Sequence, residues 1–180
     1  MTSESDKDIV SALKENVEQG FRLLMTSYEE AIYWHIRRLV VSHDDAQDAT
    51  QETFVRVFRS IEKFKGDSSL STWIYRIATN EALRLIGQRK TNQTSIDNNK
   101  SEANAIEADK YVDYSNLEAV KLQKAIQALP TKQQLAFNLR YYDELSFKEI
   151  AEISGSTAAN MKANYHIAKE KIIKYMNSMT

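Results

Sequence analysis

A chain of 180 residues with 42% hydrophobic residues can bury the core of one medium-sized domain or of two small ones, which excludes global disorder. It holds only 4 glycines and 1 proline, and because helices avoid both residues whereas sheets need many turns, the composition predicts an all-α protein. The absence of cysteine excludes disulfides and cysteine-based zinc sites and favours a reducing, cytoplasmic setting. Residues 1–10 do not read as a signal peptide, and no apolar run reaches the roughly 20 residues of a membrane span, so we expect a soluble protein without membrane insertion.

The net charge of −1 argues against a nucleic-acid partner when taken alone, but the charges are unevenly distributed. Residues 17–91 carry a net charge of +1 and residues 117–180 carry +3, whereas residues 92–116 carry −3. The two candidate modules are therefore mildly basic, and we expect any DNA affinity to be moderate and strongly dependent on salt.

The chain divides into four parts by composition and periodicity. Residues 1–16 form a polar N-terminal segment, and residues 17–91 carry apolar positions at helical spacing, which predicts a first helical module. Residues 92–116 are polar and acidic and are interpreted as a linker with a short helical turn near 103–108. Residues 117–180 return to helical spacing. The predicted fold is thus all-α, with two small helical modules joined by a polar linker.

Within the first module, a helix is predicted to begin at Ser42, with acidic residues in its first turn, where the helix dipole favours them. Its apolar face is expected to extend to Phe58 and Ile61. Residues 64–69 are rich in Gly, Asp and Ser and predict a loop, after which a helix containing Trp73 follows.

Helix boundaries in the second module are marked by individual residues. Pro130 must stop the first helix, and Thr131 is expected to cap the next one in a capping box with Gln134. Ser146 and Glu149 have the same spacing and predict a second capping box at the start of a short helix.

The segment after Ser146 has the pattern of a helix-turn-helix. Ala151 is small enough for two helices to cross closely, and Gly155 tolerates the positive φ of a tight turn. The second helix would enter the major groove with its N-terminal residues, where the exposed polar side chains are those of Ser156, Asn160, Lys162 and Asn164. The alternative is an ordinary helical hairpin in which Gly155 is only a cap.

The sequence contains no motif that indicates an enzyme. There is no glycine-rich phosphate loop and no His-Glu-x-x-His motif, and the three histidines at 35, 43 and 166 are scattered. His43, Asp44 and Asp45 are adjacent on a helix and do not converge on one ion. We therefore expect no catalytic residue, no metal and no cofactor.

Two long motifs resemble the sigma factors of bacterial RNA polymerase. Residues 44–54 and 64–80 are similar to the region that binds core polymerase and the downstream (−10) promoter element. Residues 128–130 and 145–151 are similar to the region that binds the upstream (−35) element. The short length, with only these two modules, resembles the extracytoplasmic-function (ECF) class. The resemblance implies a promoter-directing transcription initiation factor that helps to open DNA.

The resemblance implies a polymerase-docking face on the helix that follows Ser42. Its residues would contact the clamp helices of core polymerase, and a polar, acidic surface suits a basic partner. These residues are Asp44, Asp45, Asp48, Gln51 and Glu52. The alternative is a solvated acidic helix face.

The resemblance also implies that residues 64–72 capture a base flipped out of the melted non-template strand. Phe64 and Trp73 would supply aromatic surface and Lys65 a phosphate contact, although Trp73 could equally be a core residue. On the following helix, one face carries Arg76, Asn80 and Arg84, which suits a strand's phosphates and base edges. The alternative is a solvated stripe.

The recognition helix departs from the family in one respect, and two other functions compete with the sigma-factor interpretation. Residues 164–170 lack the arginines that the family's recognition helices carry, so promoter contacts there should be weaker or differently specified. A conventional helix-turn-helix regulator would bind duplex DNA without polymerase, and a helical adaptor would bind no DNA. The resemblance leaves open an anti-sigma factor as a further partner.

Overall fold

The computed structural model describes residues 3–95 and 117–178 and contains only helices in these ranges. The all-α prediction is therefore confirmed. The chain forms two compact units that divide after Thr91, each with its own core. None of the described helices is long and apolar enough to cross a membrane.

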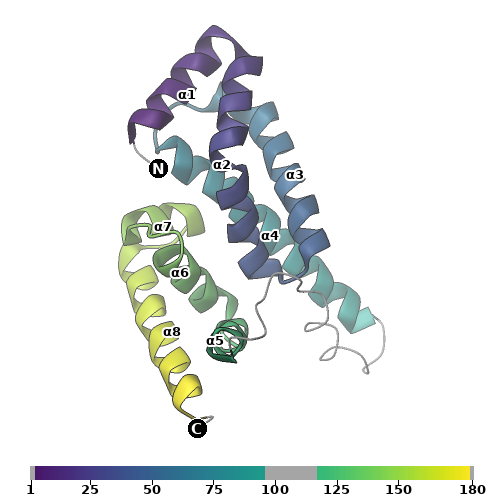
Figure 1. The fold of residues 1–180 in the computed structure, drawn as a ribbon, viewed down its shortest axis with the longest axis vertical. Coiled ribbons are helices and arrows are strands. Elements are labelled where there is room, and N and C mark those ends of the chain that lie inside the picture. Colours follow the sequence, from purple (N-terminus) through teal and green to yellow (C-terminus); the bar gives the residue numbers. More distant parts are fainter. Residues whose placement is uncertain (1–2, 96–116, 179–180) are drawn as a thin grey trace. The chain divides into compact units, whose positions relative to one another are not determined.

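The first helix, α1 (Ser3–Glu15), folds back against α2 (Val17–Val40), as Figure 1 shows. The two helices cross so closely that a Cβ at Gly20 would lie 2.4 Å from the backbone nitrogen of Leu13. Asn16 separates the helices, and its side chain accepts a hydrogen bond of 3.1 Å from the backbone of Gln19. The sequence interpretation of residues 1–16 as merely a polar segment was incomplete, because Ile9 is buried under this crossing.

Tyr28 anchors α1 to α2 in a second way. Its hydroxyl donates a hydrogen bond to Asp6, and its ring is fully buried. Burial, together with the neighbouring Asp6, raises the pKa of the Tyr28 phenol far above its ordinary value, so it stays a neutral donor at physiological pH.

Helices α2, α3 (His43–Ser60) and α4 (Leu70–Ser95) complete the first unit (Figure 1), and each contributes buried apolar side chains. A short 3-10 turn, Ile61–Lys63, precedes the loop 64–69. Within the core, His35 of α2 and Thr79 of α4 are both buried and share a hydrogen bond of 2.8 Å. The fully buried apolar side chains include Leu24, Ile32, Ile36, Val57, Ile74, Ala78 and Ala82.

Two boundaries of α4 differ from the sequence interpretation. The helix begins at Leu70 because the Ser69 hydroxyl accepts a 3.0 Å hydrogen bond from the backbone of Thr72, so residues 70–72 are helical rather than part of the loop. The helix also continues to Ser95, four residues into the stretch interpreted as linker. The helical turn predicted near 103–108 lies outside the described residues.

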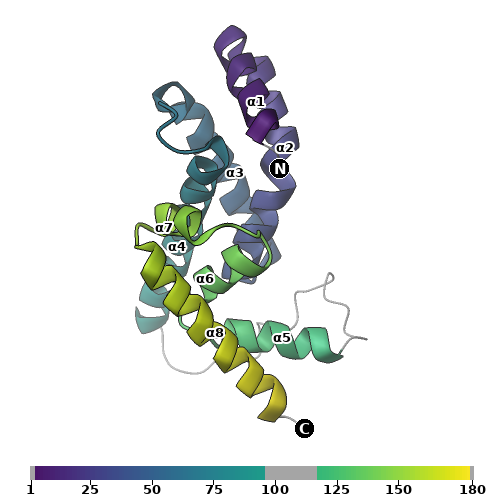
Figure 2. The same cartoon turned by 90° about the vertical axis from the view of Figure 1, so that its left-hand side faces the viewer.

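The second unit contains α5 (Leu117–Gln127), α6 (Thr131–Tyr141), α7 (Phe147–Ser154) and α8 (Ala158–Ser178). The three shorter helices all pack on α8, as Figure 2 shows. The core cluster that joins α5 and α6 to α8 comprises Ala125, Ile126, Leu129, Phe137, Ala168 and Ile172.

The two predicted capping boxes have opposite outcomes. Ser146 and Glu149 form one, with hydrogen bonds of 3.3 Å and 2.8 Å to each other's backbone. The box at Thr131 was wrong: Pro130 occupies the cap position, its side chain makes no hydrogen bond, and Gln134 is buried instead. A proline fits there because the first turn of a helix needs no donor from it.

Candidate polymerase and nucleic-acid interfaces

The acidic helix α3 presents one open polar face. Asp44, Asp48 and Gln51 are all exposed, and their spacing of four and three residues places them in one row along the helix. Val55 and Phe58 continue the same row at the same spacing. Of the five residues predicted to meet polymerase, these three lie together on an accessible surface.

The other two predicted docking residues are partly buried and take part in ion pairs. Asp45 forms an ion pair with Arg89 of α4, and Arg89 also donates a 3.2 Å hydrogen bond to the backbone of Val40. Glu52 accepts a 3.0 Å hydrogen bond from Arg56. Asp45 therefore ties α3 to α4, whereas Glu52 pairs within its own helix and keeps a side chain that is 40% exposed.

Phe58 is half exposed and does not belong to the core, so the prediction that it lies on the buried face of α3 was wrong. Its ring stands edge-on to Phe21 of α2 with centroids 5.0 Å apart. Together with Val55, which is also exposed, it lines an apolar groove between α2 and α3. The remaining lining residues are Met25, Gln51, Phe54 and Arg59. The sequence signal for this groove was the spacing of Val55 and Phe58 in register with the acidic row.

The loop 64–69 brings the predicted aromatic pair together. Phe64 and Trp73 are partly buried, with ring centroids 5.3 Å apart and planes tilted by 47°. Lys65 is exposed at the start of the loop, and Gly66 takes a φ of 80°, a conformation that favours glycine. Trp73 thus contributes to local packing while keeping part of its surface open.

The predicted stripe on α4 is exposed, but its members differ in their partners. Asn80 makes no recorded side-chain contact with the described residues, whereas Arg84 donates a 2.9 Å hydrogen bond to Glu81. Arg76 lies one turn before Asn80 and is exposed as well. The bond to Glu81 raises the pKa of the Arg84 guanidinium, so Arg84 keeps its charge under all physiological conditions.

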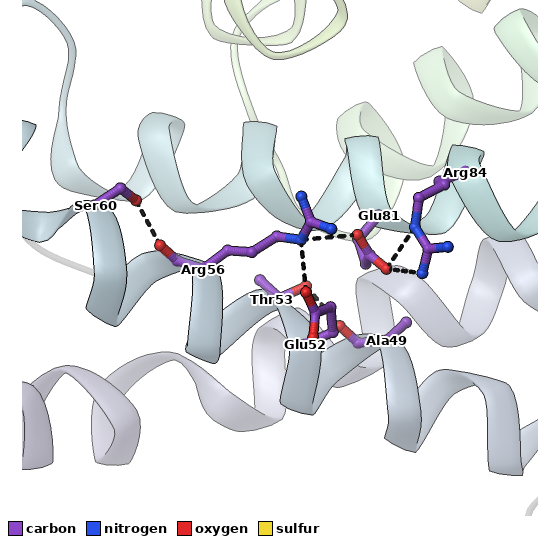
Figure 3. A network of polar contacts seen from close by, with 7 residues as sticks. All are labelled: Ala49, Glu52, Thr53, Arg56, Ser60, Glu81 and Arg84. Carbon is purple, nitrogen blue, oxygen red and sulfur yellow. Dashed lines mark hydrogen bonds and ion pairs between the residues drawn. The ribbon is translucent and has the colours of Figure 1, made fainter.

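A polar network joins α3 to α4, and its centre is Glu81 (Figure 3). The Glu81 side chain is 2% exposed, and its second carboxylate oxygen lies 3.2 Å from Nε of Arg56. Arg56 thereby contacts both Glu52 and Glu81, one from its own helix and one from α4. Sequence analysis identified neither Arg56 nor Glu81, because their pairing depends on how two distant helices pack.

The helix-turn-helix has the predicted turn. Gly155 adopts a φ of 63°, and its backbone and that of Ser156 donate to the carbonyl of Ala151. Ile150 and Met161 are buried on the two sides of the turn. A hairpin of two helices held by a left-handed glycine fits this geometry.

The four predicted base readers in and just before α8 do not share one face. Asn160 is exposed and Ser156 is half buried near the start of the helix. Lys162 is exposed but two residues from Asn160, so it points to another side. The side chain of Asn164 donates a 2.9 Å hydrogen bond to the backbone of Asn160. Asn160 is the best placed of the four for a base contact.

Comparison with known proteins gives the family. The family description "Sigma-70 region 2" matches residues 24–91, and "Sigma-70, region 4" matches residues 119–172. The RNA polymerase sigma-H factor of Pseudomonas aeruginosa is 29% identical over 99% of this chain and 97% of its own length. The ECF RNA polymerase sigma-E factor of Escherichia coli K12 is also 29% identical, over 93% of this chain and 92% of its own.

Two solved structures share the fold. The sigma factor RpoE of Bartonella quintana, in complex with the anti-sigma factor NepR, has a TM-score of 0.71 at 21% identity and covers 87% of this chain and 96% of its own. CnrH, in complex with the cytosolic domain of CnrY, has a TM-score of 0.75 at 16% identity, with 98% and 99% covered.

The two matched regions define a two-module transcription initiation factor. The chain belongs to the sigma-70 family, in its ECF class, and directs RNA polymerase to promoters. The alternative of a conventional helix-turn-helix regulator is not favoured, because such a regulator has no need of region 2.

Proposed function

We propose that the exposed row of α3 is the surface through which this chain docks on the clamp helices of core RNA polymerase. The row begins with Asp44, Asp48 and Gln51 and continues into the apolar residues Val55 and Phe58. An acidic patch beside an apolar groove supplies both long-range attraction to a basic partner and apolar area to bury. This continuity along one helix face is the observation that carries the proposal.

In this proposal, DNA is contacted by other parts of the chain than the docking row. The loop 64–69 with Phe64 and Trp73 takes a flipped base of the non-template strand, and Lys65, Arg76, Asn80 and Arg84 contact the melted strand beside it. The start of α8, led by Asn160, contacts the upstream duplex. Stacking on the aromatic pair contributes about 1–3 kcal/mol per base.

The protein supplies no catalysis in this proposal. Among the described residues no group of His, Asp or Glu could hold a metal ion. Polymerase performs the chemistry in the cytoplasm, and this subunit positions the enzyme on the promoter. An anti-sigma partner, like the anti-sigma factor NepR bound to RpoE of Bartonella quintana, is expected to compete with polymerase for α3.

The test combines binding and transcription. The tagged full-length chain is mixed with purified core polymerase, and co-elution and transcription from its cognate promoter are measured. Co-elution with promoter-dependent transcripts supports the proposal. A chain that binds duplex promoter DNA tightly but leaves core polymerase in the flow-through contradicts it.

A further inference from the structure

The side of α3 and α4 that carries the Glu81 network holds a hollow of about 630 Å³, a volume within the usual range of ligand pockets. Its walls come from both helices, and every lining residue except Ile77 has a polar or charged side chain. They include Arg56, Arg59 and Ser60 from α3 and Asn80 and Arg84 from α4. Glu52 and Glu81 are the two acidic residues of the lining. Three arginines against two glutamates leave the hollow with one net positive charge.

Glu81 lies at the centre of these arginines. Its carboxylate is almost completely buried, and each oxygen accepts from a different arginine (Figure 3). A buried carboxylate is tolerated only when it is paired, because desolvating it costs several kcal/mol. The pairing therefore fixes the guanidinium groups of Arg56 and Arg84, which are otherwise long, flexible side chains that are about half exposed.

The contacts with the glutamates use only part of each guanidinium. Arg56 reaches both Glu52 and Glu81 through Nε, and Arg84 reaches Glu81 through Nε and one terminal nitrogen. The described residues form no hydrogen bond or ion pair with the terminal nitrogens of Arg56 or with the second terminal nitrogen of Arg84. The same is true of the Asn80 amide and the Arg59 guanidinium. The donors of Arg56 and Arg84, whose positions the glutamates fix, thus remain for one acceptor group, with those of Asn80 and Arg59 beside them.

We propose that Glu81 is a positioning residue that holds Arg56 and Arg84 so that, with Asn80, they bind one backbone phosphate of the melted non-template strand. Guanidinium groups suit phosphate because their planar donors match its oxygens in pairs. The inference rests on the proposed function of α4 and adds to it a DNA contact from α3, the polymerase-docking helix. The docking row and Arg56 lie on different faces of α3, so the helix can serve both partners.

The test measures the affinity of the full-length chain for a fluorescent 12-nucleotide single strand at several salt concentrations. Each phosphate contact on a single strand contributes about 0.7 to the slope of log K against log salt. Because Arg56 and Arg84 share one phosphate, we expect the double variant to reduce the slope by about 0.7 and each single variant, Arg56→Gln or Arg84→Gln, to reduce it by part of that value. Each single variant should weaken binding about tenfold. Arg22→Gln, on an exposed arginine of α2 outside the hollow, removes the same charge and should leave the slope unchanged.

The variant Glu81→Gln distinguishes a positioning role of Glu81 from a purely electrostatic effect of its charge. The substitution removes a negative charge, so a purely electrostatic role predicts tighter DNA binding, as for Glu30→Gln on the exposed side of α2. A positioning role predicts weaker binding and a smaller slope, because the arginines lose their fixed geometry. Glu81→Asp keeps the charge and should restore part of the affinity. Binding as tight as that of Glu30→Gln overturns the proposal.

The remaining outcomes are equally decisive. If the melting curve shows that Glu81→Gln does not fold, the salt slopes of Arg56→Gln and Arg84→Gln test the proposal instead. Slopes equal to that of Arg22→Gln overturn it. Co-elution of the wild-type chain with core polymerase is measured in parallel. Loss of that binding refutes the proposed function itself, whereas normal core binding with unchanged slopes refutes only the phosphate site.

Discussion

Replacing Phe58 with alanine removes the largest apolar side chain from the proposed docking row. A phenylalanine side chain can bury roughly 200 Å². Phe58 is 50% exposed, so about 100 Å² is open to a partner, which at about 25 cal/mol per Å² corresponds to about 2.5 kcal/mol. Because association also orders side chains, this figure is an upper limit, and we expect Phe58→Ala to weaken core binding between about tenfold and sixtyfold.

The assay is a titration of labelled chain with core polymerase, read by anisotropy, beside a thermal melt of the free chain. The buried half of Phe58 packs on Phe21, so the melting temperature should fall by several degrees while the helical content stays the same. Leu23→Ala is the matched control, because Leu23 is a comparably exposed apolar residue of α2 that does not line the groove. Equal core affinity for Phe58→Ala and Leu23→Ala refutes the assignment of the groove.

Three further changes test other parts of the structure. Asp48→Lys reverses an exposed charge and should weaken core binding by about 1 kcal/mol at low salt and by less at high salt. The melting temperature should not change, and wild-type affinity at every salt concentration would contradict the role of Asp48. Gly20→Ala places a Cβ 2.4 Å from the Leu13 backbone and should destabilise the α1–α2 crossing by about 1–3 kcal/mol. Hydrogen exchange of the α1 amides should become faster, and unchanged exchange rates would count against a close crossing. Asn138→Leu removes a fully buried amide whose atoms have no hydrogen-bond partner among the described residues. The free energy of unfolding, measured with urea, should therefore rise by about 1 kcal/mol. A lower free energy of unfolding would show that the amide makes hydrogen bonds in the folded protein.

Features set by neighbouring residues were predictable from the sequence. The capping box of Ser146 and Glu149 and the left-handed Gly155 depend on contacts within a few residues, and both have the predicted geometry. The acidic row was predictable in part: the helical period places Asp48 outside, but the ion pair that turns Asp45 inward needs Arg89, which is distant in sequence. Local rules also failed at Thr131, where the preceding proline takes the cap position.

The missed features depend on tertiary packing. Nothing near Glu81 in the sequence distinguishes it from a solvated helix residue, and its burial becomes evident only when Arg56 approaches from α3. Phe58 has the hydrophobicity of a core residue, yet α3 turns its ring toward a groove that no described residue fills. The helix α1 was hidden by its polar composition, since Ile9 is the single apolar residue among its described side chains that is fully buried.

As a sigma factor, this chain should open promoter DNA only as a subunit of RNA polymerase. Permanganate footprinting on a promoter found by sequencing chromatin bound to the chain tests it most directly, since permanganate modifies unpaired thymines. We predict reactive thymines at the downstream element only when the chain and core polymerase are both present, and weaker reactivity with Asp48→Lys when the chain is limiting. Reactivity that needs no core polymerase, or duplex protection without any melting in its presence, would contradict the account.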